Sequence, residues 1–352
     1  MAAFLAAACD ADGPVAPDPS AALGPASEVV SDRDLVLEDL EFRPGVTADV
    51  HVRLFVNESF PCRGRPRTAL AVHGVNHTAA TWEELAEAFF RGAREEQLCR
   101  VAALDLPGHG ESGIPDPSLL SFGEMLIQDN VGTVRGVLDR LAEQGFMPRI
   151  LLGHSQGTLT LQLLQETLRR SGTTLAEAHG VTDVVFFGTV GPREAPNAFP
   201  PNVDDLIASL VTTTPERGTF VGTSPSVFQE LWFSNLSGEL SSRAPSLETI
   251  AEKGLDSPGP LFGILQTVGS GGFQRPSVSA GVFAAASGTR LQVVDFADDP
   301  FSPTPDAARV YEHLTEDASR SGFVSLTDPA NEAVHDYTIT HPDRVRAAVA
   351  VP

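Results

Sequence analysis

A Gly-His-Ser-Gln-Gly stretch at residues 153–157 constrains this chain more than any other feature. It follows an apolar run that ends at Gly153, and a helix-like segment at residues 158–170 comes after it. G-x-S-x-G between a strand and a helix is the nucleophile-elbow pattern, in which a tight turn leaves the serine exposed. Glycine is needed because a Cβ in so tight a turn would collide with neighbouring backbone. The pattern predicts a strand–turn–helix unit with Ser155 at its corner, at the positive end of a helix dipole.

Apolar runs of strand length alternate with helix-like segments along most of the chain. Residues 34–42 and 46–56 alternate in polarity around the turn Arg43-Pro44-Gly45, which predicts an antiparallel hairpin. Buried strands are predicted at residues 67–73, 100–106, 149–153, 182–188, 290–296 and 322–327. Helices are predicted at residues 81–97 with Thr81 as cap, 121–144 opening on the capping-box pair Ser121 and Glu124, 158–170, 304–317 and 341–351. This order predicts an α/β fold, with a mostly parallel, twisted sheet and helices on both faces.

The alternation stops after Gly188 and resumes at Arg290, across a stretch rich in Pro, Ser, Gly, Phe and Thr. We therefore expect an insertion within one continuing fold. The expected segments are a signal remnant and disordered tether at residues 1–33, the core at 34–188, the insertion at 189–288 and the rest of the core at 289–352.

The formal net charge of −22 disfavours nucleic acid or an anionic membrane surface as partner, because both require clustered cations. No run of about 18 apolar residues is present, so no transmembrane helix is predicted. Residues 1–9 resemble the tail of a bacterial lipoprotein signal, with Cys9 as the lipidated residue and a lipid anchor there. The chain is therefore expected to be exported from the bacterial cytoplasm; a plain disordered tail on a cytoplasmic protein is the alternative.

Cys62 and Cys99 each lie just before a predicted buried strand. If those strands are parallel neighbours, the two thiols share one sheet edge and a disulfide becomes geometrically feasible. A disulfide would favour an oxidising compartment, whereas two unpaired thiols would fit a cytosolic protein.

Three motifs give the chain a resemblance to the α/β-hydrolase family. They are Ala71-Val72-His73-Gly74, Asp105-Leu106-Pro107-Gly108-His109-Gly110-Glu111-Ser112 and Gly153-His154-Ser155-Gln156-Gly157, which occur in the family's order at compatible spacings. The resemblance covers residues 34–350, and the insertion falls where the family carries its lid. It implies a serine esterase or lipase-like member whose lid caps the site. Most aromatic residues of the insertion are expected to pack the lid onto the core, and some of them to line an apolar pocket: Phe199, Phe220, Phe228, Trp232, Phe233, Phe262 and Phe273.

The resemblance also implies which residues form the site. The oxyanion hole would use the backbone amides of Val75 and Gln156, with Asn76 as an alternative donor. His73, Gly74, Gly153, His154 and Gly157 would shape the elbow and the oxyanion loop. His77 is expected at a polar loop tip, with contact to the substrate as the alternative. His109 and Ser112 are expected in a structural turn.

The family's acid follows the strand after the lid, commonly before a proline. Asp299 directly precedes Pro300 and is the favoured acid, while Asp298 and Asp295 remain alternatives. The base is expected after the final strand, at His335, with His341 at a helix start as the alternative.

Ser155, His335 and Asp299 in this order predict a serine hydrolase that cleaves a carboxylic ester through an acyl-enzyme. No cofactor and no metal is implied, and the partner is a small-molecule ester or acyl substrate. One alternative is an aminopeptidase-like amide hydrolase, for which lid carboxylates would grip an amine: Asp204, Asp205, Glu216 and Glu230. A second alternative is a non-catalytic ligand-binding protein of the same fold.

Overall fold

The computed structural model describes residues 30–58, 67–74, 77–91, 98–116, 118–120, 126–197, 275–299, 301–330 and 333–350. Cys9, Cys62, Val75 and Asn76 lie outside these residues. The aromatic and acidic side chains singled out in the insertion also lie outside them.

One eight-stranded sheet runs through the described part of the chain, in the order β1-β2-β4-β3-β5-β6-β7-β8. β1 and β2 form the predicted antiparallel hairpin, β2 joins β4 antiparallel, and the remaining neighbours pair in parallel. The strands are β1 (Val30–Arg43), β2 (Val46–Asn57), β3 (Thr68–Val72), β4 (Arg100–Leu104), β5 (Ile150–His154), β6 (Asp183–Phe187), β7 (Arg290–Phe296) and β8 (Phe323–Leu326). The predicted mostly parallel α/β sheet is confirmed.

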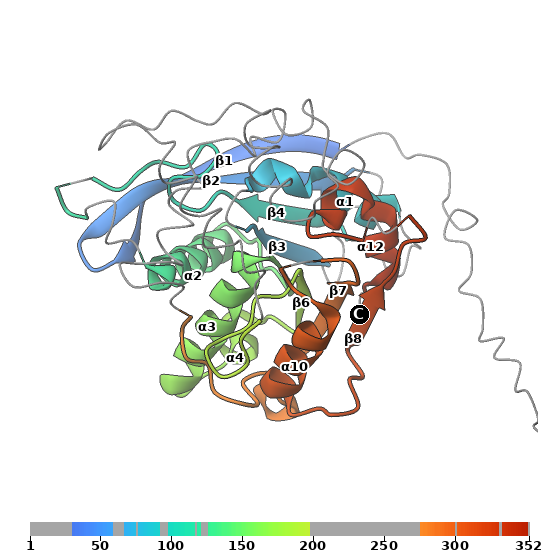
Figure 1. The fold of residues 1–352 in the computed structure, drawn as a ribbon. Helices are drawn as coiled ribbons and strands as arrows, with labels where there is room; N and C mark the ends of the chain where they lie inside the picture. The colour runs from blue at the N-terminus through green and yellow to red at the C-terminus, as the bar shows by residue number, and fades with distance from the viewer. Residues whose placement is uncertain are drawn as a thin grey trace, which may run out of the picture.

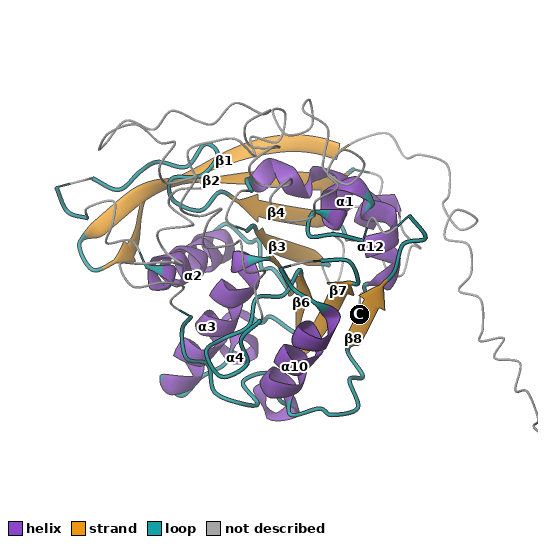
Figure 2. Ribbon diagram, in the orientation of Figure 1, coloured by secondary structure: helices purple, strands orange, loops and turns teal. Residues whose placement is uncertain are grey.

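Helices cover both faces of the sheet (Figures 1 and 2). The helices are η2 (Ala79–Trp82), α1 (Glu83–Arg91), α2 (Ile127–Glu143), α3 (Gln156–Arg170), α4 (Leu175–His179), η6 (Ala285–Ser287), α10 (Thr304–Thr315), α11 (Tyr337–Thr340) and α12 (Pro342–Ala348). The apolar sides of α2, α3, α4 and α10 share one buried cluster, and those of α1, α11 and α12 share another on the opposite face. β3, β5 and β6 are buried at every position, because layers on both faces exclude water from them.

Two helix starts differ from the prediction. η2 begins at Ala79 and is capped by Thr78, whose hydroxyl accepts from the Ala80 amide at 3.3 Å, so Thr81 is not the cap. α2 begins at Ile127 rather than at Ser121. The backbone amide of Leu126, just before the helix, donates a hydrogen bond to the Asp129 carboxylate at 2.7 Å.

The boundaries of the predicted segments also move. β1 begins at Val30, inside the stretch expected to be a tether. Residues 275–283 belong to the body rather than to the insertion, since Val278, Val282 and Phe283 are buried in the core cluster that includes α3 and α10. The Arg275 guanidinium donates to the Asn197 carbonyl oxygen at 2.9 Å, so these two described residues, 78 positions apart, are in direct contact.

Within the described residues, no helix combines the length and apolar character that crossing a bilayer requires. Cys99 is buried and disulfide-bonded. Because Cys62 and Cys9 lie outside the described residues, pairing with Cys62 stays a prediction.

Candidate active site

The turn between β5 and α3 holds Ser155 in a strained conformation. Ser155 has φ +51° and ψ −121°, a region that non-glycine residues rarely adopt and that costs about 1–3 kcal/mol. Its amide N–H donates to the Phe187 carbonyl oxygen at 3.0 Å, and its carbonyl oxygen accepts from the Thr158 hydroxyl at 2.7 Å. A Cβ at Gly157 would lie 2.2 Å from the Val72 carbonyl oxygen, so α3 can approach β3 this closely only with glycine there. A Cβ at Gly153 would lie 3.0 Å from Leu161 Cδ1, which is a milder contact.

The loop after β3 lies against this turn. A Cβ at Gly74 would lie 2.7 Å from Ser155 Cβ. The loop therefore passes so close to the serine that a side chain at position 74 would collide with it. His73 is fully buried and fixes the loop, because its Nδ1–H donates to the Gly74 carbonyl oxygen at 2.7 Å and its Nε2 accepts from the Leu106 amide at 3.0 Å. Burial holds the pKa of His73 well below its usual value, so the ring is neutral.

Asp299 is the carboxylate that bonds to His335. Its Oδ2 accepts from His335 Nδ1 at 2.8 Å, and its Oδ1 accepts from the Phe301 amide at 2.8 Å. The Asp298 side chain is half-exposed, while the Asp298 amide donates to the Ala333 carbonyl oxygen at 2.9 Å. Asp295 is buried but bonds to the hydroxyls of Thr304 and Ser325 instead.

His335 and Ser155 each contact residues at the carboxyl end of β6. A Cβ at Gly188, just after β6, would lie 2.9 Å from His335 Cε1, and the residue before it, Phe187, holds the Ser155 amide. His154, the neighbour of Ser155, donates from Nε2 to the His335 carbonyl oxygen at 2.8 Å. The predicted Ser155, Asp299 and His335 thus lie together, whereas His341 directly precedes α12 and bonds to Thr340.

The charge state of His335 reflects two opposing effects. Burial lowers its pKa, but the hydrogen-bonded Asp299 carboxylate and the nearby Asp336 carboxylate outweigh burial, so the pKa is raised overall. A histidine placed this way accepts a proton more readily than an isolated buried imidazole would.

Gln156 is the first residue of α3, and its side chain is buried. Because Gln156 lies at the N-terminal end of α3, the helix dipole favours negative charge near its backbone.

Comparison with known proteins agrees with this geometry. Residues 69–348 match the profile of a family described as "Alpha/beta hydrolase family". The chain belongs to the alpha/beta hydrolase family.

Solved structures with this fold include the carboxylesterase CesB of Bacillus subtilis, with TM-score 0.55 and 14% identity over 90% of each chain. The N-acyl homoserine lactonase AidH has TM-score 0.53 and 17% identity over 90% of this chain and 94% of its own. The esterase RhEst1 from Rhodococcus sp. ECU1013 has TM-score 0.53 and 16% identity over 86% of this hydrolase and 93% of its own length. At these identities the likeness shows the fold alone.

Among curated proteins, protein phosphatase methylesterase 1 of Homo sapiens and of Pongo abelii are each 33% identical over 88 residues. The match spans 25% of this hydrolase and only 20% of either relative.

In this hydrolase, Asp105 joins neighbouring segments through hydrogen bonds that the motif alone did not predict. Asp105 accepts from the Ala79 amide at 2.6 Å and from His51 Nδ1 at 2.7 Å. As expected for a structural turn, the Ser112 hydroxyl donates to the Asp105 carbonyl oxygen at 2.6 Å. The His109 ring packs against that of His73, with ring centroids 4.8 Å apart.

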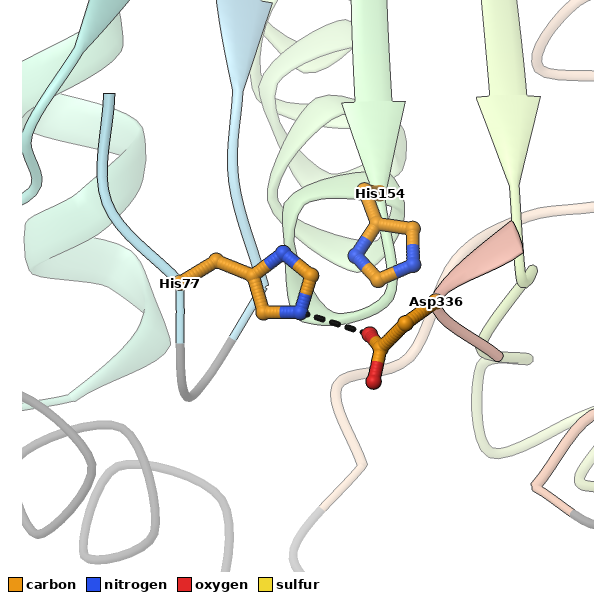
Figure 3. A group of neighbouring side chains, drawn as sticks. All are labelled: His77, His154 and Asp336. Atoms are coloured by element: carbon orange, nitrogen blue, oxygen red, sulfur yellow. Dashed lines mark hydrogen bonds and ion pairs between the residues drawn. The ribbon is translucent and has the colours of Figure 1, made fainter. Parts of the chain in front are cut away.

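The expectation for His77 was wrong. This residue is 5% exposed rather than at a polar loop tip, and its Nε2 bonds to Asp336 Oδ1 at 2.8 Å (Figure 3). Its ring stacks on His154, with centroids 4.5 Å apart. Sequence reasoning missed this pair because its members are 259 positions apart; the one signal was the position of each polar residue beside a proposed site residue.

Proposed function

We propose that this hydrolase cleaves a carboxylic ester through an acyl-enzyme on Ser155, with His335 as base and Asp299 as its carboxylate partner. The observation that carries the proposal is the 2.8 Å hydrogen bond between Asp299 Oδ2 and His335 Nδ1, at the strand edge where Ser155 turns. Since an ionised carboxylate only accepts hydrogen bonds, Nδ1 carries the ring proton and Nε2 carries the lone pair that takes the serine's proton.

The reaction proceeds in two halves. Ser155 Oγ attacks the acyl carbonyl carbon while His335 Nε2 takes the hydroxyl proton, and the amides of Gln156 and Val75 hold the oxyanion. The His335 imidazolium then protonates the leaving oxygen, and the alcohol departs. In the second half His335 deprotonates a water that attacks the acyl carbon. The Oγ–acyl bond then breaks, and the His335 imidazolium returns the proton to Ser155 Oγ as the acid leaves. Asp299 holds the ring orientation and stabilises the imidazolium in both halves.

Neutral acyl substrates fit this site best. The chain carries a net charge of −22, and the ionised Asp336 lies close to His335. A negatively charged acyl group would be repelled by these carboxylates. The names of the similar proteins, a carboxylesterase, a lactonase and a methylesterase, support an ester and make methyl esters worth including among test substrates.

The deciding experiment compares p-nitrophenyl esters of rising chain length, simple methyl esters and amino-acid anilides. Wild type should turn over esters, and Ser155→Ala should abolish that turnover while retaining the wild-type far-ultraviolet circular dichroism. A fluorophosphonate should label Ser155 in wild type and much more slowly in His335→Gln. Faster anilide than ester turnover would favour the amide hydrolase, and ester turnover that survives Ser155→Ala would refute the proposal.

A further inference from the structure

A second buried histidine–carboxylate pair lies beside His335, and the proposed mechanism does not use it. We propose that Asp336, held by His77, is a positioning residue for the reaction: it locks the His335 loop against the oxyanion loop and stabilises positive charge on His335. This inference depends on the proposed function, because it assigns the pair a role through His335.

The bond between His77 and Asp336 joins two loops of the site. His77 lies on the loop after β3, and its amide donates to the Gly74 carbonyl oxygen at 3.3 Å. Asp336 directly follows His335 and is 1% exposed. The 2.8 Å bond between His77 Nε2 and Asp336 Oδ1 therefore connects the oxyanion loop to the loop of the proposed base.

His154 adds the third loop, that of the nucleophile. Figure 3 shows its ring at the end of β5, above the His77–Asp336 bond. The rings of His154 and His77 stack, with an interplanar angle of 22°, while His154 Nε2 donates to the His335 carbonyl oxygen at 2.8 Å. Within the described residues, the loops that carry Gly74, Ser155 and His335 thus meet at one buried polar cluster, and a shift of one member would displace the others.

Asp336 also supplies charge where the reaction needs it. Burial raises its pKa, but His77 in particular lowers it, to about 2, so Asp336 is ionised at neutral pH. Burial holds the pKa of His154 well below its usual value, which leaves that ring neutral. Among the described residues, the charged groups that face His335 are therefore Asp299, which bonds to Nδ1, and Asp336, which acts through space. Both favour the imidazolium in a medium of low dielectric constant.

The same three side chains also offer ligand atoms within 4.8 Å of one another, as a metal site would. A metal ion bound by two imidazoles lies about 2 Å from each nitrogen, in the plane of each ring. Rings that stack at 22° do not point their lone pairs at one such position. The geometry is thus that of a hydrogen-bonded cluster. The experiments below also test whether these side chains bind a metal ion.

The test is the pH dependence of kcat/KM for Asp336→Asn on p-nitrophenyl acetate, beside wild type. The acid limb of this profile reports the pKa of the base in the free enzyme. Removal of the Asp336 charge should move the limb about one unit to lower pH and reduce the plateau about tenfold. Asp298→Asn, which removes a carboxylate that does not bond to His335, is the matched control and should leave limb and plateau unchanged.

A second pair of variants keeps the test valid if Asp336→Asn does not fold. In His77→Gln the side-chain amide can replace the Nε2–H donor, so the wild-type limb and most of the activity should remain. In His77→Leu the donor is lost, and kcat should fall about tenfold with KM unchanged. Equal activity of the two His77 variants would overturn the positioning role.

Two further outcomes would also overturn the inference. One is an unmoved acid limb in folded Asp336→Asn. The other is activity of wild type that is lost on treatment with EDTA and restored by Zn²⁺, which would favour a metal centre. Failure of the inference is separable from failure of the proposed function, because ester turnover that survives Ser155→Ala would refute the function itself, whatever the Asp336 variants do.

Discussion

At the scale of single residues, the hydrogen bond to Asp299 distinguishes the two ring nitrogens of His335, because Nδ1 makes this bond and Nε2 does not. Asp299 is 2% exposed, and its two oxygens accept from the Phe301 amide and from His335 Nδ1. The hydrogen bond from the Phe301 amide fixes the orientation of the Asp299 carboxylate. The carboxylate in turn fixes the tautomer of the His335 ring. The neighbouring Asp298 carries the same charge but is half-exposed, so its side chain is better solvated by water.

Asp299→Asn tests this division of labour. An asparagine amide can donate to Nδ1 and so stabilise the tautomer whose proton is on Nε2, which cannot take the serine's proton. We expect kcat on p-nitrophenyl esters to fall on the order of 10⁴-fold with the fold intact. Asp298→Asn, measured alongside, should remain within about twofold of wild type. A smaller loss of kcat in Asp299→Asn than in Asp298→Asn would show that Asp298, and not Asp299, is the acid.

At the scale of elements, a buried histidine connects the hairpin to the loop after β4. His51 on β2 bonds through Nδ1 to Asp105 at 2.7 Å and through Nε2 to Asp34 on β1 at 2.8 Å. Burial lowers the pKa of His51, but the two carboxylates outweigh burial and raise it to about 8. Asp105 also accepts from the amide that begins η2, so this carboxylate connects His51 to the start of η2.

This arrangement predicts a stability that depends on pH. Because folding raises the pKa of His51 from 6.5 to about 8, its contribution is fully present below pH 6.5 and is lost as the pH rises through 8. Between pH 6.5 and 9 the free energy of unfolding should fall by about 1–2 kcal/mol from this group. Urea unfolding of wild type and His51→Gln at both pH values measures it. An equal change in both proteins would show that His51 is not the source.

At the scale of the whole molecule, the site is assembled at one edge of the sheet from loops that are distant in sequence. The strands β3, β5, β6 and β7 are parallel neighbours, so the loops that follow them emerge on the same side. That edge receives the loop after β3, the turn that holds Ser155, and Asp299, while His335 comes from the segment after β8. Parallel topology thus explains why residues 74, 155, 299 and 335 converge.

The opposite edge, where β3 and β4 begin, carries the disulfide-bonded Cys99. We expect its partner to be Cys62, which precedes β3 as Cys99 precedes β4. Peptide mass spectrometry without reductant should recover a Cys62–Cys99 cross-link, and reduction should lower the free energy of unfolding by about 2–4 kcal/mol. A cross-link to Cys9 would contradict the pairing. Free thiols in protein isolated from its native compartment would contradict both the pairing and the expectation of export.

Local pattern predicted most elements to within a few residues, because strand and helix periods are written in neighbouring positions. β7 was placed at residues 290–296 with no error, and Ser155 followed from glycines only two positions away. The start of α2 differs from the prediction, because the helix begins at Ile127, where the Asp129 carboxylate accepts from the Leu126 amide.

The sequence by itself determined the alternating fold, the strained serine turn and the set of candidate acids and bases. Only the tertiary structure showed that Asp299 bonds to His335 and that His77 bonds to Asp336, 259 residues away. The physical reason is the distance along the chain over which each interaction acts. Periodicity and turn chemistry act between near neighbours, whereas the orientation of a buried carboxylate is decided by whichever distant N–H groups the sheet brings within hydrogen-bonding distance.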